Sequence, residues 1–242
     1  MKNIIPSFRD SLFSKNTDIL IDISEYTIDN LIKSSDTLTD FPIIKTIASV
    51  LKGAYNIYDR NLLKNTLVFI QELNSGIIDE EKYIAYKTTI EHNPNKCEKE
   101  LGRVILILNN IIDVSKSKML ARLFKAYINK ILTWEEFCEY SEIVNRIFLK
   151  DIALLKKIND GEVTCINEDD KEKYRIHRLN SIGVIEISID KVTVAIINGS
   201  IKPKQLIAIS DVGNKFLKIV LDSNWQNIVI SQNIWHYFSL AL

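Results

Sequence analysis

The chain has 242 residues, of which 46% are hydrophobic and 26% are charged, with 31 basic and 31 acidic side chains. This composition is typical of a folded globular protein with one large core or two modest ones, and it excludes a wholly disordered chain. The formal net charge of zero excludes the overall basic character by which many proteins bind nucleic acids.

Several features of the composition bear on the setting of the protein. The 7 glycines and 4 prolines are few for this length, which favours long helices. Rich use of Ile, Asn and Lys suggests an AT-rich genome, such as that of a bacterium or phage. The cysteines, Cys97, Cys138 and Cys165, are odd in number and form no C-x-x-C pair, which predicts a reducing compartment. Because the first ten residues lack a secretory pattern, we expect a cytoplasmic protein.

Two amphipathic segments open the predicted N-terminal bundle. The spacing of apolar residues predicts a helix over Thr17–Lys33 and a second over Pro42–Tyr58, where proline suits the first turn. The second run is interrupted by lysines and is shorter than the roughly 20 apolar residues of a membrane span, so we expect a core helix. The alternative is a helix at the membrane periphery or against a partner. Its candidate contact residues are Ile43, Ile47, Val50, Leu51 and Tyr55.

Further helices complete a multi-helix bundle over residues 1–150. Periodicity predicts them at Arg60–Leu73, Asp79–Glu91, Glu98–Asp113 and Ser115–Ile128. Thr133 and Glu136 have the spacing of a capping box, followed by an apolar helix that we expect to continue to about Ile158. The whole protein is therefore predicted to be mostly α.

Residues 151–242 have the pattern of a small α+β domain. We expect a helix that ends at Gly183, three short strands and a helix that Ser210 caps. The helices are predicted over Glu172–Ile182 and Asp211–Leu221, the strands over Val184–Ile189, Val192–Ile197 and Gln205–Ile209, and a tight turn at Asn198-Gly199. The last stretch, Trp225–Leu242, is apolar enough to form a helix that packs on the body or on another chain.

Two glycine-centred motifs give this part a resemblance to known proteins. They are Leu179-x-x-Ile-Gly-Val-Ile-Glu186 and, after the hairpin, Ile209-Ser-x-x-Gly213-x-x-Phe216-Leu217. This arrangement resembles a bacterial winged helix and the C-terminal end of the Abi-alpha (abortive-infection alpha) proteins. The resemblance implies a winged-helix fold over the last third of the chain and a role in defence against phage. It transfers no functional residues.

The sequence contains no recognisable catalytic pattern. His92, His177 and His236 are isolated, and no zinc-ligand spacing, phosphate-binding glycine loop or nucleophile elbow is present. The acidic runs at 79–81 and 168–170 could bind a divalent cation, but a helix start and a solvated loop explain them more simply. We therefore predict no enzyme, no cofactor, no metal site and no small-molecule substrate, with an enzyme of unrecognised type as a minor alternative.

The predicted helix before the hairpin decides between two binding functions. In a winged helix the equivalent helix enters the DNA major groove, and here Lys171, Arg175 and Arg178 fall along one side of it, with Tyr174 and Ile182 towards the core. The acidic residues at its start would repel phosphate. We therefore expect a non-enzymatic interaction protein, acting through a partner protein, self-association or a membrane surface, and keep a DNA-binding transcriptional regulator as the alternative.

Overall fold

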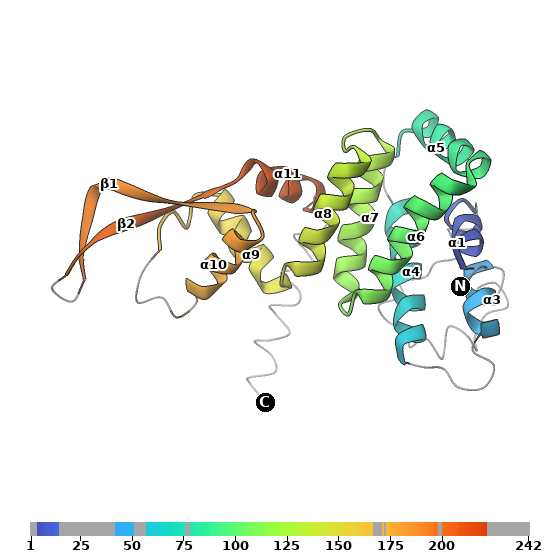
Figure 1. Ribbon diagram of the computed structural model, residues 1–242, viewed down its shortest axis with the longest axis horizontal. Helices are drawn as coiled ribbons and strands as arrows, with labels where there is room; N and C mark the ends of the chain where they lie inside the picture. Colours follow the sequence, from blue (N-terminus) through green and yellow to red (C-terminus); the bar gives the residue numbers. More distant parts are fainter. Residues whose placement is uncertain are drawn as a thin grey trace. The chain divides into compact units, whose positions relative to one another are not determined.

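The computed structural model describes residues 4–14, 42–50, 57–75, 78–166, 171, 173–197 and 200–221. Contacts divide the chain into two compact units, Met1–Asn145 and Arg146–Leu242. The predicted fold class is confirmed, because the described residues form helices and one small antiparallel sheet in the C-terminal unit (Figure 1). The helices predicted over Thr17–Lys33 and Trp225–Leu242 lie outside the described residues.

The N-terminal unit is a helical bundle with an aromatic core. Its described helices are α1 (Ile4–Leu12), α3 (Pro42–Val50), α4 (Ile57–Asn74), α5 (Glu80–His92), α6 (Pro94–Asn110), α7 (Val114–Ile128) and α8 (Trp134–Arg146). Four buried phenylalanines connect the helices, with ring centroids 6.0 Å apart for Phe8 and Phe69, 5.7 Å for Phe69 and Phe124, and 5.4 Å for Phe124 and Phe137. These spacings are those of favourable tilted and edge-to-face aromatic pairs.

Local capping sets where several helices begin. The predicted capping box is confirmed, because the Thr133 N–H donates to Glu136 at 2.7 Å and the Glu136 N–H donates to Thr133 at 3.1 Å. For helix α6, the predicted start at Glu98 is wrong, because the helix begins at Pro94. Asn93 accepts from the Lys96 N–H at 3.0 Å, and a proline in the first turn loses no intrahelical hydrogen bond.

The long helix predicted from Thr133 to about Ile158 is two helices. α8 ends at Arg146, and α9 (Leu149–Asn159) begins after Phe148, whose backbone is extended. The apolar pattern continues across this break, so it does not reveal where one helix ends and the next begins. Close to this break, Asp151 in the first turn of α9 accepts hydrogen bonds from Arg175 and Arg178, which lie more than 20 positions away in the sequence. Apolar periodicity does not report such long-range contacts.

The C-terminal unit contains α9, α10 (Lys173–Ser181), β1 (Ile185–Ile197), β2 (Ser200–Ile209) and α11 (Asp211–Val220). The prediction of three strands is wrong, because Val184–Ile189 and Val192–Ile197 contribute to the single strand β1. The pairing shifts between Asp190 and Val194, and this irregularity takes up the extra residues so that β1 continues along β2. The long hairpin extends beyond the helices of its own unit (Figure 1).

Helix α11 is attached to the turn that precedes β1. Gly183 has φ +78°, as predicted for a glycine that ends a helix. The predicted cap is confirmed, since the Ser210 hydroxyl accepts from the Gly213 N–H at 3.0 Å. The same hydroxyl donates to the Gly183 carbonyl at 2.7 Å, and the Ser210 N–H donates to the Val184 carbonyl at 3.2 Å. The start of α11 is therefore tied to this turn by two hydrogen bonds.

Candidate functional site

Two of the three predicted nucleic-acid contacts meet at a buried carboxylate. Arg175 Nε donates to Asp151 Oδ1 at 2.9 Å, and Arg178 donates to both oxygens, at 2.6 Å from Nε and 2.8 Å from Nη2. Arg175 also donates to the Lys150 carbonyl. Lys171 is exposed before the start of α10. The structure therefore brings together two of the predicted residues and shows that both connect α10 to α9.

Asp151 is the centre of this arrangement, and the sequence analysis missed it. Its side chain is almost fully buried, which a carboxylate tolerates when cations and hydrogen bonds compensate for lost water. The hydrogen bond and charge of Asp151 raise the pKa of Arg178 above its ordinary value. A carboxylate in the first turn of α9 is also favoured by the helix macrodipole.

The rings of two exposed aromatic residues lie close to the Arg178 guanidinium. Its central carbon lies 4.1 Å from the ring centroid of Phe148 and 5.4 Å from that of Tyr174. Both residues are more than half exposed, at 56% for Phe148 and 57% for Tyr174. We call Phe148, Arg178 and Tyr174 the aromatic–arginine stack. Asp151 fixes its central guanidinium, so the stack has a defined shape at the surface.

The prediction that Tyr174 faces the core is wrong. Ile176 and Leu179 are buried, whereas Tyr174, expected in the core, is exposed. Residues three apart lie on one side of a helix, so burying this pair turns Tyr174 outward. In the sequence, the apolar pair Ile176 and Leu179 could have identified the buried side of this helix. The outer side carries Tyr174, His177 and Asn180, so it is polar and aromatic rather than strongly basic.

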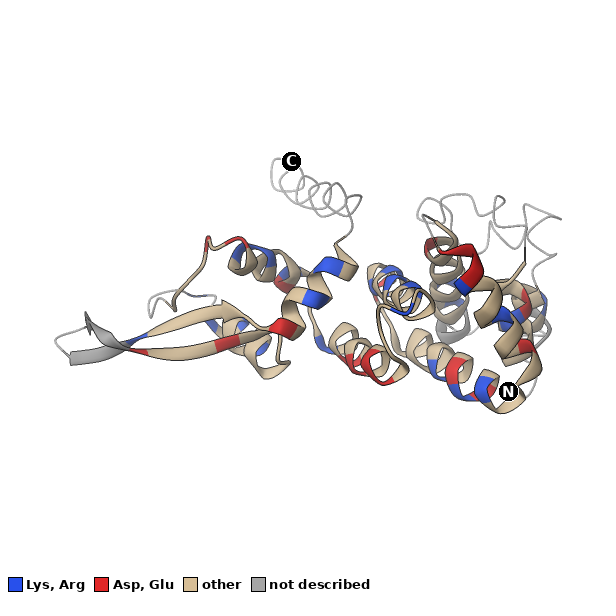
Figure 2. Ribbon diagram, turned by 90° about the horizontal axis from the view of Figure 1, so that it is seen from above, with Lys and Arg blue, Asp and Glu red and all other residues tan. Residues whose placement is uncertain are grey.

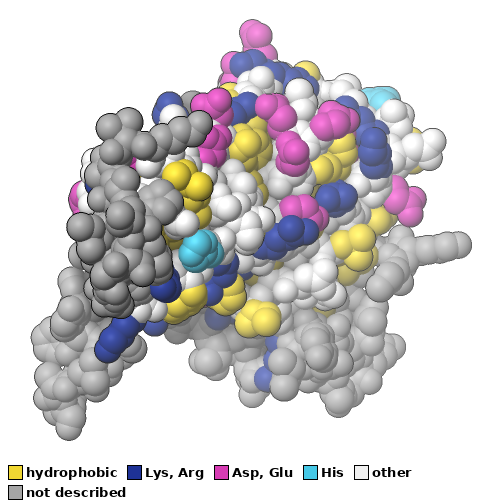
Figure 3. Space-filling view, turned by 60° about the vertical axis from the view of Figure 1, so that its left-hand side comes forward, with side chains coloured by type: hydrophobic (Ala, Val, Ile, Leu, Met, Phe, Trp, Pro, Cys, Tyr) yellow, Lys and Arg dark blue, Asp and Glu magenta, His cyan; other side chains and the backbone are white. Residues whose placement is uncertain are grey.

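The charges of the described residues are mixed rather than segregated. Figure 2 shows basic and acidic positions interspersed along the helices of each unit. In the space-filling view, hydrophobic side chains lie between charged ones of both signs on the face towards the viewer (Figure 3). This pattern differs from the continuous basic surface that phosphate backbones attract.

The residues proposed for membrane or partner contact lie partly in the core. Ile43 and Ile47 are buried in α3, which packs on α1. Ser11 anchors the start of α3 by accepting from the Ile43 N–H at 3.0 Å. Leu51 and Tyr55 lie outside the described residues, as does the side chain of Val50. Among the helices that are described, none combines the length and the apolar character needed to cross a membrane.

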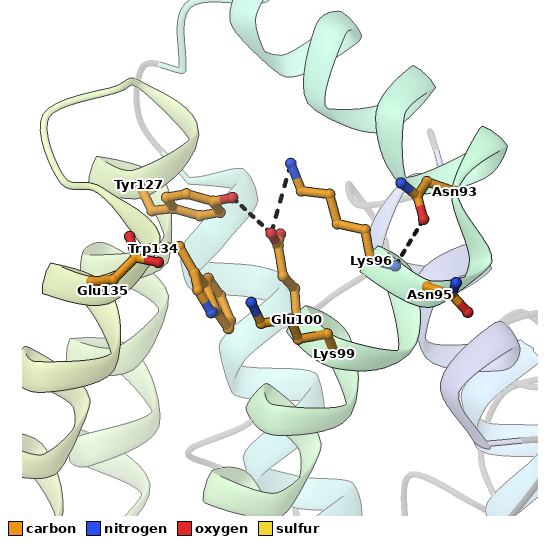
Figure 4. Close-up of a pocket in the computed structure, with 8 residues that line it drawn as sticks. All are labelled: Asn93, Asn95, Lys96, Lys99, Glu100, Tyr127, Trp134 and Glu135. Atoms are coloured by element: carbon orange, nitrogen blue, oxygen red, sulfur yellow. Dashed lines mark hydrogen bonds and ion pairs between the residues drawn. The ribbon is translucent and has the colours of Figure 1, made fainter.

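A shallow open hollow in the N-terminal unit forms a second candidate site (Figure 4). Its volume is about 450 Å³. One wall is the beginning of α6, with Asn93, Asn95, Lys96 and Lys99. The other consists of Tyr127, Trp134 and Glu135 from the end of α7 and the start of α8, and Glu100 lies between the walls.

Glu100 is the buried polar centre of this hollow. Its side chain accepts from the Tyr86 hydroxyl and from the Tyr127 hydroxyl, each at 2.9 Å, while only 3% of the residue is exposed. Among the described residues, the Lys96 ammonium is the cation that pairs with Glu100, at 3.7 Å. Burial first, and then the charge of Glu100, raise the pKa values of both tyrosines. Sequence analysis missed Glu100, although a carboxylate beside Leu101 on an apolar helix side was a signal.

Replacing Glu100 with glutamine is expected to lower the free energy of unfolding by about 1–3 kcal/mol. Glutamine has nearly the same shape, but it loses the charge that strengthens the two hydrogen bonds from tyrosine. Urea unfolding monitored by circular dichroism would measure the change. The exposed Glu98→Gln on the same helix is the matched control, and equal stabilities of the two variants would contradict a stabilising role for the Glu100 network.

The described residues contain no group of three or more His, Cys, Asp or Glu side chains placed to hold a metal ion. Asp79, from the first predicted acidic run, instead caps α5 by accepting from the Lys82 N–H at 3.1 Å. The second run, 168–170, lies outside the described residues.

Comparisons with family models, with curated proteins and with solved structures find no match for this chain.

Proposed function

We propose that the protein is a binding protein rather than an enzyme, and that its C-terminal unit docks a protein partner. The observation that carries this proposal is the aromatic–arginine stack, in which the rings of two exposed residues lie close to a guanidinium held by Asp151. The helix-turn-hairpin-helix order around it is compatible with a winged-helix module in a protein-contact role. The phage-defence setting rests on the resemblance alone.

The composition of the stack favours a protein partner. Tyrosine, phenylalanine and arginine are enriched at protein interfaces, and tyrosine and arginine contribute many of the side chains that dominate binding energy. Because Asp151 already orients Arg178, docking would restrict fewer side-chain rotamers than it would for a free arginine. Exposed aromatic residues next to a fixed guanidinium therefore offer a contact surface that loses little side-chain entropy on binding.

The DNA-binding alternative receives less support from the same residues. Arg175 and Arg178 share the carboxylate of Asp151, which reduces the positive charge they could present to phosphate. The most exposed side chains of α10 are largely uncharged. Salt-dependent DNA affinity scales with the number of phosphates that are neutralised, and α10 supplies few free cations for that purpose.

Site-specific photo-cross-linking in expressing cells tests the proposed docking. A benzophenone amino acid would replace Tyr174, which lies in the stack, or Ile84, which is similarly exposed on α5 of the other unit. We expect a discrete protein adduct from position 174 that is absent from position 84. The adduct should decrease strongly when the position-174 protein also carries Phe148→Ala, because that change removes one ring of the stack.

Each result has a defined meaning. Adducts that nuclease treatment removes would support the DNA-binding alternative and contradict the proposal. Equal adducts at both positions, or none at position 174, would also contradict it. An adduct containing only this chain would identify the partner as a second copy. Circular dichroism of each purified variant checks that the substitutions leave the fold intact.

A further inference from the structure

We propose that the hollow around Glu100 binds a small zwitterion of the α-amino-acid class. The hollow belongs to the N-terminal unit, and the inference does not depend on the aromatic–arginine stack of the other unit. It assigns a ligand rather than a substrate. The proposal rests on the two walls of the hollow, which differ chemically and lie on either side of a buried carboxylate (Figure 4).

The wall beside α7 and α8 fits an ammonium group. Trp134 and Tyr127 present aromatic rings 5.4 Å apart between centroids, and Glu135 adds a carboxylate at the rim. Organic ammonium groups are attracted both to the faces of aromatic rings and to carboxylates. Glu100, between the walls, would attract an ammonium group most strongly because its charge is buried, so solvent screens it least.

Glu100 retains capacity for a further donor. An ionised carboxylate offers about four lone-pair positions, and the two tyrosine hydroxyls occupy one on each oxygen. Lys96 approaches one oxygen only to 3.7 Å, longer than a charge-assisted hydrogen bond. Lys96 is also partly exposed, so its ammonium can turn towards solvent. A ligand ammonium could therefore replace it at closer range.

The wall at the start of α6 fits a carboxylate. Lys96 and Lys99 supply positive charge there, and the start of a 17-residue helix attracts anions through its macrodipole. The two lysines balance Glu100 and Glu135, so the lining as a whole is neutral. A simple diamine would be repelled by the two lysines, and a dicarboxylate would be repelled by the two glutamates. A molecule with one charge of each sign matches both walls.

Titration of the full-length protein with three matched probes tests this assignment. The probes are L-leucine, 3-methylbutylamine, which lacks the carboxylate, and 4-methylpentanoate, which lacks the amine. The readout is the indole N–H signal of Trp134 in nitrogen-15 NMR spectra, identified by its loss in Trp134→Phe. We expect leucine to shift this signal with a Kd of about 0.1–10 mM, as is ordinary for so small a ligand. Each single-charge probe should bind at least about tenfold more weakly.

Charge variants separate the two walls. Lys99→Gln, at an exposed position, should weaken leucine by about fivefold and leave 3-methylbutylamine unchanged. Glu100→Gln should weaken both of these probes, with its fold checked by circular dichroism. Lys87→Gln on α5 is the matched control and should change neither. No leucine-dependent shift up to about 50 mM, or equal binding of all three probes, would overturn the proposal.

Discussion

Replacing Gly213 with alanine is expected to destabilise the C-terminal unit by about 3 kcal/mol or more. A Cβ at this position would fall on the Val184 carbonyl oxygen and lie 2.8 Å from the carbonyl carbon. Backbone atoms cannot turn away as a side chain can, so the start of α11 would have to separate from the turn at Gly183. The hydrogen bonds that Ser210 makes to this turn would then be strained or lost.

Hydrogen exchange followed by mass spectrometry can measure this effect unit by unit. Peptides from α11 and the hairpin should lose protection in Gly213→Ala, while peptides from the N-terminal unit keep theirs. Gly102→Ala is the matched control, because its new Cβ would lie 3.2 Å from the movable side-chain tip of Ile5 and alanine favours the helix interior. Unchanged protection of α11 would show that the turn can move aside at little cost.

Replacing Asp151 with alanine is expected to lower the free energy of unfolding of the C-terminal unit by about 3–5 kcal/mol. The variant leaves the Arg175 and Arg178 guanidinium groups without the carboxylate that holds them, and Arg175 is largely buried. Removing one partner of a buried ion pair costs far more free energy than losing a surface ion pair, because the charge that stays buried is uncompensated. Urea unfolding, with hydrogen exchange to assign the transition to this unit, would measure the loss.

The Asp151 variant also tests the link between stability and binding. Asp160→Ala, at an exposed position just after α9, is the matched control and should change stability little. Under conditions in which Asp151→Ala stays folded, we still expect a weaker photo-adduct at position 174, because Asp151 no longer holds Arg178 beside the two rings. Full stability of Asp151→Ala would show that the ion pairs contribute little and would contradict a fixed stack.

Features that depend on neighbouring residues could be predicted from the sequence. The Thr133–Glu136 capping box, the Ser210 cap and the left-handed Gly183 each involve backbone groups within one turn of the chain. The mostly helical class followed in the same way from apolar periodicity and from the scarcity of glycine and proline. These features are local, so a short window of sequence contains the atoms that decide them.

The candidate sites could not be predicted, because their partners are distant in sequence. Asp151 meets arginines 24 and 27 positions away, and Glu100 meets tyrosines 14 and 27 positions away. An arginine that faces solvent and one that holds a buried carboxylate look the same in the sequence, so the sequence pattern leaves Arg175 and Arg178 as candidate DNA contacts. Only tertiary packing decides burial, and burial decides whether a charge is screened by water or fixes a neighbouring group in place.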